Sequence, residues 1–165
     1  MHDSVVMLRR DAVSLCFFSC LPFAGLWSTI VYHKIETIGT NTIALLLDTF
    51  FTVMALCLCS SVFTGLLIKR TYRGLRAPSI RKDENFWRLF PESPWAMGFI
   101  TGVYAFIALS VTFDITYGAF NWAEITLTQF VLVKMSYSGV LGALTAFMTI
   151  QKIMPGESAS DRIQI

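Results

Sequence analysis

The stretch KRTYRGLRAPSIRKDENFWRLFPESPW, residues 69–95, decides the fold, because it is the longest polar segment and has long apolar runs on both sides. The chain has 165 residues, of which 55% are hydrophobic and 15% are charged. Charged residues make up about a quarter of an ordinary soluble domain. A transmembrane helix needs about 20 apolar residues, so two crossings fit on each side of the stretch. The sequence therefore predicts an all-α integral membrane protein, a bundle of four transmembrane helices arranged as two in-out-in hairpins.

We expect a single membrane domain over residues 1–165. The expected spans are residues 12–32, 43–68, 95–115 and 125–154, and a connector covers residues 69–94. Pro94 suits the first turn of the third span, where a missing N–H costs no helical hydrogen bond. The first apolar run is too long for the core of a cleavable signal peptide, so we expect it to be retained as a span.

The distribution of basic residues predicts the orientation. Eleven of the 13 Lys and Arg residues precede the first span, lie in the connector, or lie at or beyond the end of the fourth span. Of the other two, Lys34 lies in a short link and Lys134 lies inside a span. Cytoplasmic loops retain Lys and Arg, so both termini are expected in the cytoplasm. The compact loops and the lack of an organelle address favour a bacterial inner membrane.

Three ionisable residues lie inside or at the edge of the expected spans: Asp48, Asp114 and Lys134. At 1.5 Å per residue from the cytoplasmic ends of their spans, they lie about 31, 28 and 27 Å above the inner interface. All three therefore share one level in the outer leaflet. A lysine in hydrocarbon costs about 2.5 to 3.5 kcal/mol on insertion scales. We expect Asp48 or Asp114 to reduce that cost by pairing with Lys134.

Two interpretations of these three residues are open. In the first, Lys134 and the two acids form a polar, outward-opening site that binds a charged solute or relays protons. In the second, they are structural. Lys134 then forms an ion pair or extends its ammonium to the outer headgroups, and the acids mark the end of the apolar core.

Small residues four positions apart recur in the last three expected spans. In membranes such residues let helix backbones approach closely. We expect packing faces inside the monomer, or against another copy or another subunit, at these positions: Ser61, Gly65, Gly98, Gly102, Gly139 and Gly142.

The connector combines a basic part with an aromatic part. Residues 69–82 carry six basic residues and no acidic one, which near anionic lipid supplies about 1 kcal/mol per residue. The segment DENFWRLF, residues 83–90, favours a short amphipathic helix at the interface. Either the charge only holds the loop inside, or the connector docks a partner. The residues expected to contact lipid or a partner are Arg70, Arg73, Arg76, Arg81, Lys82, Phe86 and Trp87.

Catalytic and cofactor motifs are not found in this sequence. The four cysteines all fall inside apolar runs, and the two histidines lie at opposite ends of the expected first span. A metal site needs convergent ligands, so we expect no metal and no cofactor. We expect no nucleic-acid binding, because the membrane surface already accounts for the basic charge.

Two functional hypotheses lead from the sequence, and an intramembrane enzyme ranks behind both. The first is a permease-like transporter, or a component of one, with an outer-leaflet site made by Lys134, Asp48 and Asp114. The second is a non-catalytic accessory or scaffold subunit of a larger membrane complex. The expected partners are the lipid bilayer and, for the second hypothesis, other copies or subunits.

Overall fold

The chain is nearly all helical. The computed structural model describes residues 2–32, 37–39, 43–71, 90–91, 93–120 and 124–153. Its elements are α1 (His2–Tyr32), β1 (Thr37–Gly39), α2 (Ile43–Thr71), α4 (Pro94–Phe120), β2 (Glu124–Thr126) and α5 (Leu127–Ile153). Each of the four helices contains a run of 23 to 26 residues that is long and apolar enough to cross a bilayer. This agrees with the class and the number of spans predicted from the sequence.

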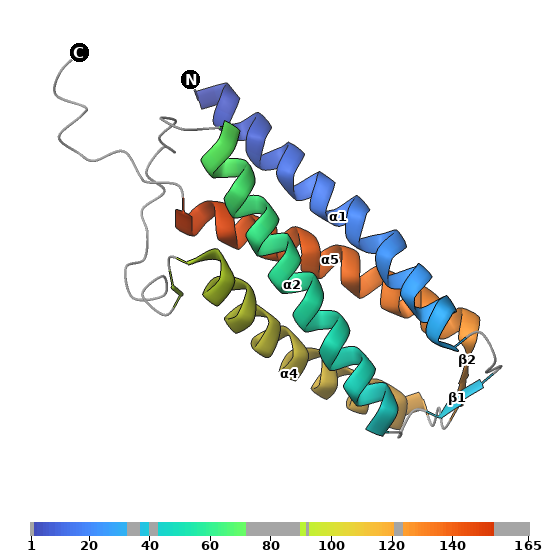
Figure 1. The fold of residues 1–165 in the computed structure, drawn as a ribbon. Coiled ribbons are helices and arrows are strands. Elements are labelled where there is room, and N and C mark those ends of the chain that lie inside the picture. The colour runs from blue at the N-terminus through green and yellow to red at the C-terminus, as the bar shows by residue number, and fades with distance from the viewer. Residues whose placement is uncertain are drawn as a thin grey trace, which may run out of the picture.

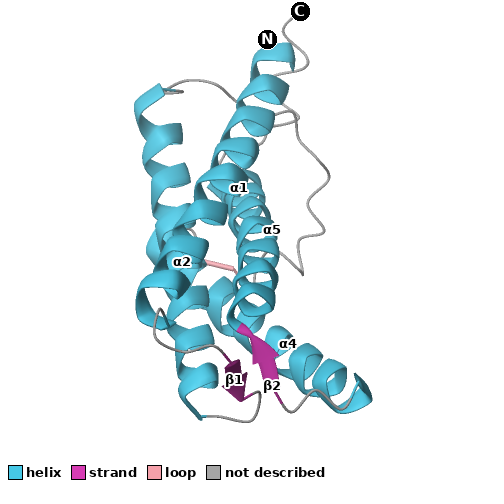
Figure 2. Cartoon of the chain, turned by 90° about the vertical axis from the view of Figure 1, so that its right-hand side faces the viewer, coloured by secondary structure: helices cyan, strands magenta, loops and turns pink. Residues whose placement is uncertain are grey.

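The four helices form one elongated bundle (Figures 1 and 2). Strands β1 and β2 lie together at one end, which we call the ribbon end. The opposite end carries the start of α1, the end of α2, the start of α4 and the end of α5, and we call it the basic end. The basic side chains described at that end are Arg10, Lys69, Arg70 and Lys152.

Helices α2 and α5 form the centre of the bundle. Helix α1 packs mainly on α5, α4 packs mainly on α2, and α2 and α5 pack on each other, whereas α1 touches α2 and α4 touches α5 only slightly. The apolar window of α2 is accordingly 56% buried and that of α4 only 22%. The most extensive packing therefore joins the first and last helices, α1 and α5, whereas of the consecutive pairs only α2 and α4 pack extensively.

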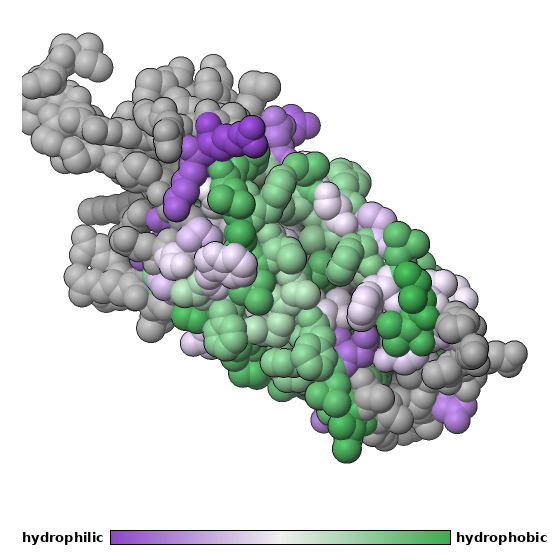
Figure 3. Space-filling view, in the orientation of Figure 1, coloured by the Kyte–Doolittle hydropathy of each residue, from purple (hydrophilic) through white to green (hydrophobic). Residues whose placement is uncertain are grey.

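The polarity of the bundle is inverted relative to a soluble protein. Large apolar side chains such as Phe18, Leu26 and Phe51 are exposed along the helices, and apolar side chains cover the middle of the face seen in Figure 3. In contrast, hydroxyl side chains such as Ser61 and Thr145 are buried. Lipid solvates the apolar surface, and several of the buried polar groups, such as Ser61 and Thr149, hydrogen-bond inside the bundle.

A two-stranded antiparallel ribbon closes one end of the bundle. It joins the link after α1 to the link after α4, with Ile38 opposite Ile125. The fourth span is expected from about residue 125, whereas residues Glu124–Thr126 form β2 and α5 begins at Leu127. The reason is a capping box. Thr126 Oγ1 accepts a hydrogen bond from the Gln129 N–H at 3.3 Å, and Gln129 Oε1 accepts one from the Thr126 N–H at 3.0 Å.

The other helix boundaries differ less from the expected ones. Helix α4 begins at Pro94, and the Met97 N–H donates to the Ser93 carbonyl oxygen at 2.9 Å, as expected for a first-turn proline. Helix α1 begins ten residues earlier than the expected span, and α2 continues to Thr71. The apolar windows reach Arg10 in α1 and Arg70 in α2, so most of the α1 extension lies outside its window.

Candidate functional site

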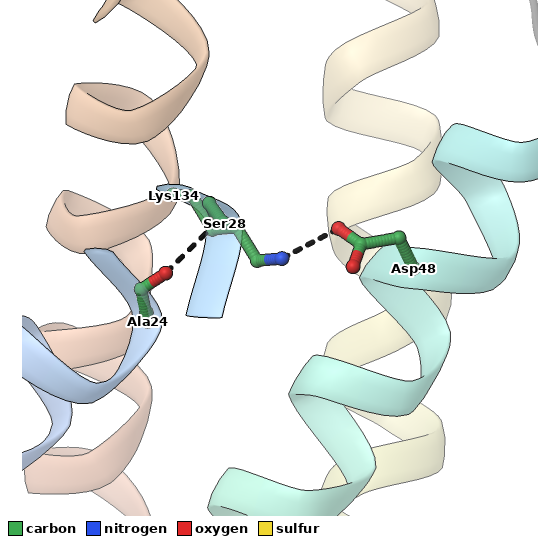
Figure 4. Close-up of polar contacts among 4 residues, drawn as sticks. All are labelled: Ala24, Ser28, Asp48 and Lys134. Atoms are coloured by element: carbon green, nitrogen blue, oxygen red, sulfur yellow. Dashed lines mark hydrogen bonds and ion pairs between the residues drawn. The ribbon is translucent and has the colours of Figure 1, made fainter. Parts of the chain in front are cut away.

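Lys134 and Asp48 form an ion pair inside the bundle. Lys134 Nζ donates to Asp48 Oδ2 at 2.5 Å, and the two side chains are 0% and 9% exposed. Figure 4 shows the lysine extending across the α2–α5 interface toward the carboxylate. The ammonium does not reach outward to headgroups, because its side chain is completely buried. Of the interpretations drawn from sequence, extension of the ammonium to the surface is therefore wrong.

An apolar cluster covers the ion pair on the side of the ribbon. It consists of Tyr32, Leu45, Ile125 and Phe130, all buried, with Leu127 packed against them. The rings of Tyr32 and Phe130 meet edge to face, with centroids 5.3 Å apart. Lys134 Nζ lies 5.4 Å from the centroid of the Phe130 ring, within the range of a cation–π contact. The pair is thus closed off from the ribbon end.

Asp114 does not join the ion pair. Its side chain is exposed on α4, a helix that packs mainly on α2 and only slightly on α5, which carries Lys134. The structure therefore brings together two of the three ionisable residues singled out from the sequence. Counting residues along the spans predicts one depth for all three, but it does not predict which side of α4 carries Asp114, and in the structure that side is exposed.

Two buried hydroxyls lie one helical turn from the ion pair, on its basic-end side. Thr52 follows Asp48 by four residues and Ser138 follows Lys134 by four residues, so each lies on the same helix face as its charged neighbour. Thr52 is 5% exposed and Ser138 is 0% exposed. Neither hydroxyl has a hydrogen-bond partner among the described residues. Neither hydroxyl was predicted as part of a site, although the spacing of four from each charge is visible in the sequence.

An apolar layer follows the two hydroxyls toward the basic end. Val53 and Leu141 pack with Cys57, and Val53 and Cys57 are completely buried. Partly buried apolar side chains of α4, Ala105, Phe106 and Leu109, pack against this layer. From the ribbon end toward the basic end, the α2–α5 interface therefore passes from the ion pair and the two hydroxyls to an apolar layer.

Beyond the apolar layer lies a neutral hydroxyl network. Ser61 Oγ donates to the Pro94 carbonyl oxygen at 2.7 Å and lies 3.0 Å from Thr149 Oγ1. Thr149 in turn donates to the Thr145 carbonyl oxygen at 2.7 Å, and Thr145 Oγ1 lies 3.5 Å from Cys57 Sγ. This network joins α2, α4 and α5 near the basic end.

The cysteines take part in contacts between α1 and α2. Cys16 Sγ lies 3.7 Å from Thr64 Oγ1, and Cys20 Sγ lies 3.5 Å from Ser60 Oγ. All four cysteines are free thiols, and Cys59 is exposed. Outside these contacts α1 and α2 are separated by an open, apolar groove of about 380 Å³, lined by residues that include Leu15, Phe23 and Phe63.

The glycines of the helices lie at close helix–helix contacts. A Cβ atom at Gly98 would lie 2.8 Å from the Cys57 carbonyl oxygen, and one at Gly142 would lie 2.5 Å from Cys20 Sγ. The remaining small residues singled out from the sequence, Gly65, Gly102, Gly139 and Ser61, are also buried. In the structure Gly98, Gly102, Gly139, Gly142 and Ser61 make contacts within the chain.

Most of the connector residues singled out from the sequence lie outside the described residues. These are Arg73, Arg76, Arg81, Lys82, Phe86 and Trp87. Arg70 is described, at the end of α2, and its side chain is exposed. Its expected contact with lipid or a partner stays a prediction.

Within the described part of the chain, no group of three or more His, Cys, Asp or Glu side chains is placed to hold a metal ion. The site is therefore described by its ion pair, its unpartnered hydroxyls and the apolar layers on both sides. Comparisons of the chain with known protein families, with curated proteins and with solved structures give no match.

Proposed function

We propose that this chain is a permease-like transporter, or a component of one, and that the Lys134–Asp48 pair takes part in its transport step. The observation that carries the proposal is a completely buried lysine within an apolar span, with a carboxylate oxygen 2.5 Å from its ammonium. Ionisable groups inside membrane spans are costly and rare, and they mark solute pathways and proton relays.

The pair offers a simple exchange of partners. A proton that binds Asp48 removes the negative charge that holds the Lys134 ammonium. An anionic solute can compete for Lys134 in the same way, and a cation can compete for Asp48. Each event frees one charge inside the bundle, and that charge must find a new partner or a route to water. Asp114, exposed on α4, takes no part in this exchange.

For the topology we propose two in-out-in hairpins in a bacterial inner membrane, with the basic end and both termini in the cytoplasm. The support is the gathering of Arg10, Lys69, Arg70 and Lys152 at one end of the bundle. Reporter fusions after residues 36, 80, 122 and 165 test this. Fusions after 80 and 165 should be active only with a cytoplasmic reporter, and the opposite result would overturn the orientation.

The transport proposal is tested with purified protein in proteoliposomes that contain a pH-sensitive dye, or the radiolabelled charged solute under test. The informative variant is Lys134→Met/Asp48→Asn, which removes both charges and so leaves neither buried charge alone. Flux should be lost in this variant, while Asp114→Asn retains it. Equal flux in wild type and in the folded double variant would show that the pair is structural.

The second candidate function is an accessory subunit of a larger membrane complex. The observation in its favour is the apolar groove between α1 and α2, which is open to the surroundings and is wide enough to receive apolar side chains of a transmembrane helix of another subunit. Crosslinking through the exposed Cys59 followed by mass measurement tests it. A crosslinked heteromer supports the second candidate, whereas a monomer without crosslinks counts against it.

A further inference from the structure

The polar side chains at the centre of the bundle have fewer partners than they need. Thr52 Oγ1 and Ser138 Oγ are buried in the α2–α5 region without a hydrogen-bond partner among the described residues. A hydroxyl carries one donor hydrogen and two acceptor lone pairs. A buried hydroxyl without a partner costs free energy, and in native structures ordered water usually satisfies such groups.

The ion pair next to these hydroxyls adds more hydrogen-bonding capacity. The Lys134 ammonium has three N–H donors, and the contacts described for it are Asp48 Oδ2 and the face of the Phe130 ring. Asp48 has a second carboxylate oxygen. A buried water typically makes about three hydrogen bonds to polar groups. Two charged groups and two hydroxyls, one helical turn apart on facing helices, supply such a set.

Apolar side chains limit this polar region at both ends. Toward the ribbon it is covered by the cluster that includes Tyr32 and Phe130. Toward the basic end it is followed by Val53 and Leu141, beyond which the hydroxyl network of Ser61 begins. An apolar constriction between polar compartments blocks conduction by excluding water.

We propose that Asp48, Thr52, Lys134 and Ser138 form a binding site for ordered water in the centre of the bundle, and that the Val53–Leu141 layer closes it toward the basic end. The class of ligand is water, including water that carries a proton. The functional role of this water site rests on the proposed transport function. In that function, the species that reaches the ion pair is a proton carried by water.

Hydration is measured without any transport assay. Wild-type protein labelled with 15N at lysine is placed in bilayers, and water-edited solid-state NMR records polarisation transfer from water to each lysine Nζ. The Lys134 signal is identified by its loss in Lys134→Met/Asp48→Asn. Transfer to Lys134 Nζ is expected in wild type, and its absence there overturns the water site.

Variants locate the water. Thr52→Val/Ser138→Ala should lose transfer to Lys134 Nζ, because the hydroxyls that hold the water are gone. Ser136→Ala is the matched control, since Ser136 is exposed on α5 and donates to the Leu132 carbonyl oxygen. Unchanged transfer in Thr52→Val/Ser138→Ala overturns the role given to the two hydroxyls.

The apolar layer is tested separately with Leu141→Ala in proteoliposomes that contain a pH-sensitive dye, under an imposed potential. The proton leak should rise at least about tenfold over wild type, which corresponds to about 1.4 kcal/mol of barrier. Leu144→Ala, at an exposed position on α5, should leave the leak unchanged. An unchanged leak in Leu141→Ala overturns the closure by this layer.

The two proposals fail in different experiments. If wild type transports no solute or proton but shows water transfer to Lys134 Nζ, the proposed function is overturned and the water site is retained.

Discussion

The two polar regions of the α2–α5 interface differ in how their groups are satisfied. Near the ribbon, a buried ammonium meets one carboxylate, and the neighbouring hydroxyls of Thr52 and Ser138 have no described partner. Near the basic end, Ser61 and Thr149 meet each other and backbone carbonyl oxygens, and every group is neutral. The first region combines charge with unmet hydrogen bonds, and the second is a closed set of neutral bonds.

This difference separates a candidate site from a structural network. A buried charge that loses its partner lowers stability strongly. A neutral hydrogen bond between membrane helices contributes little to stability. Stability effects should therefore be large near the ribbon and small near the basic end. Four substitutions test that contrast, in order of expected effect.

The largest effect is expected from Asp48→Asn, which leaves the Lys134 ammonium buried without its carboxylate. Breaking a buried ion pair by removing one partner costs about 3 to 5 kcal/mol. Reversible unfolding in mixed micelles measures the loss. Asp114→Asn, at an exposed acid, should change stability by less than about 0.5 kcal/mol. If the two variants were equally stable, the Lys134–Asp48 pair would contribute nothing measurable to the free energy of unfolding.

The second effect concerns packing rather than charge. It tests whether the part of the bundle near the basic end tolerates an added methyl group as well as it is expected to tolerate the loss of a neutral hydrogen bond. In Gly142→Ala the new Cβ would meet Cys20 Sγ at 2.5 Å and the Cys16 backbone oxygen at 3.0 Å. Overpacking of this kind costs about 1 to 3 kcal/mol. At Gly139 the nearest atoms belong to the Leu21 side chain, which can move, so Gly139→Ala should cost less in the same unfolding assay.

The third effect belongs to the ribbon end. Thr126→Ala removes one half of the capping box at the start of α5, and loss of such a cap costs about 0.5 to 2 kcal/mol. Thr128→Ala, at an exposed position of the first turn, is the matched control. Thermal unfolding of both variants measures the difference, and equal midpoints would show that the cap contributes nothing.

The smallest effect is expected from Ser61→Ala at the centre of the neutral network. Thr149 keeps its bond to the Thr145 carbonyl oxygen, so no buried donor loses its acceptor. Hydrogen bonds between membrane helices average about 0.6 kcal/mol in double-mutant cycles. If Ser61→Ala lowered the free energy of unfolding as much as Asp48→Asn does, the two polar regions would not differ in their contribution to stability. Ser136→Ala, with only an intrahelical bond, supplies the baseline.

The sequence predicts the class and the spans well because both depend on runs of apolar residues. It also predicts that Lys134 pairs with Asp48 or Asp114, because counting residues along the spans places all three at one level, and the structure pairs Lys134 with Asp48. Depth does not give the rotation of a helix about its axis. For that reason Asp114 was grouped with the pair, although α4 directs it to the surface.

Two other features were harder to find for physical reasons. The strands of the ribbon have three residues each, too few to show an alternating pattern. The central position of α2 and α5 follows from side-chain packing between helices far apart in sequence, which no local pattern encodes. Thr126 and Gln129 have the spacing of a capping box, but the apolar residues that follow extend the predicted span across them.

The separation of the paired charges along the chain has a consequence for synthesis. Asp48 and Lys134 are 86 residues apart, so α2 is made and enters the membrane long before the partner of its carboxylate exists. Its apolar window has the highest mean hydropathy of the four, which offsets the cost of inserting an acid alone. Helix α5 has the lowest mean hydropathy and carries the lysine, but it is made last, when the carboxylate is already in place to receive it. The span with the highest hydropathy, α2, therefore precedes the span with the lowest, α5. When α5 inserts, the carboxylate that pairs with its lysine is already in the membrane.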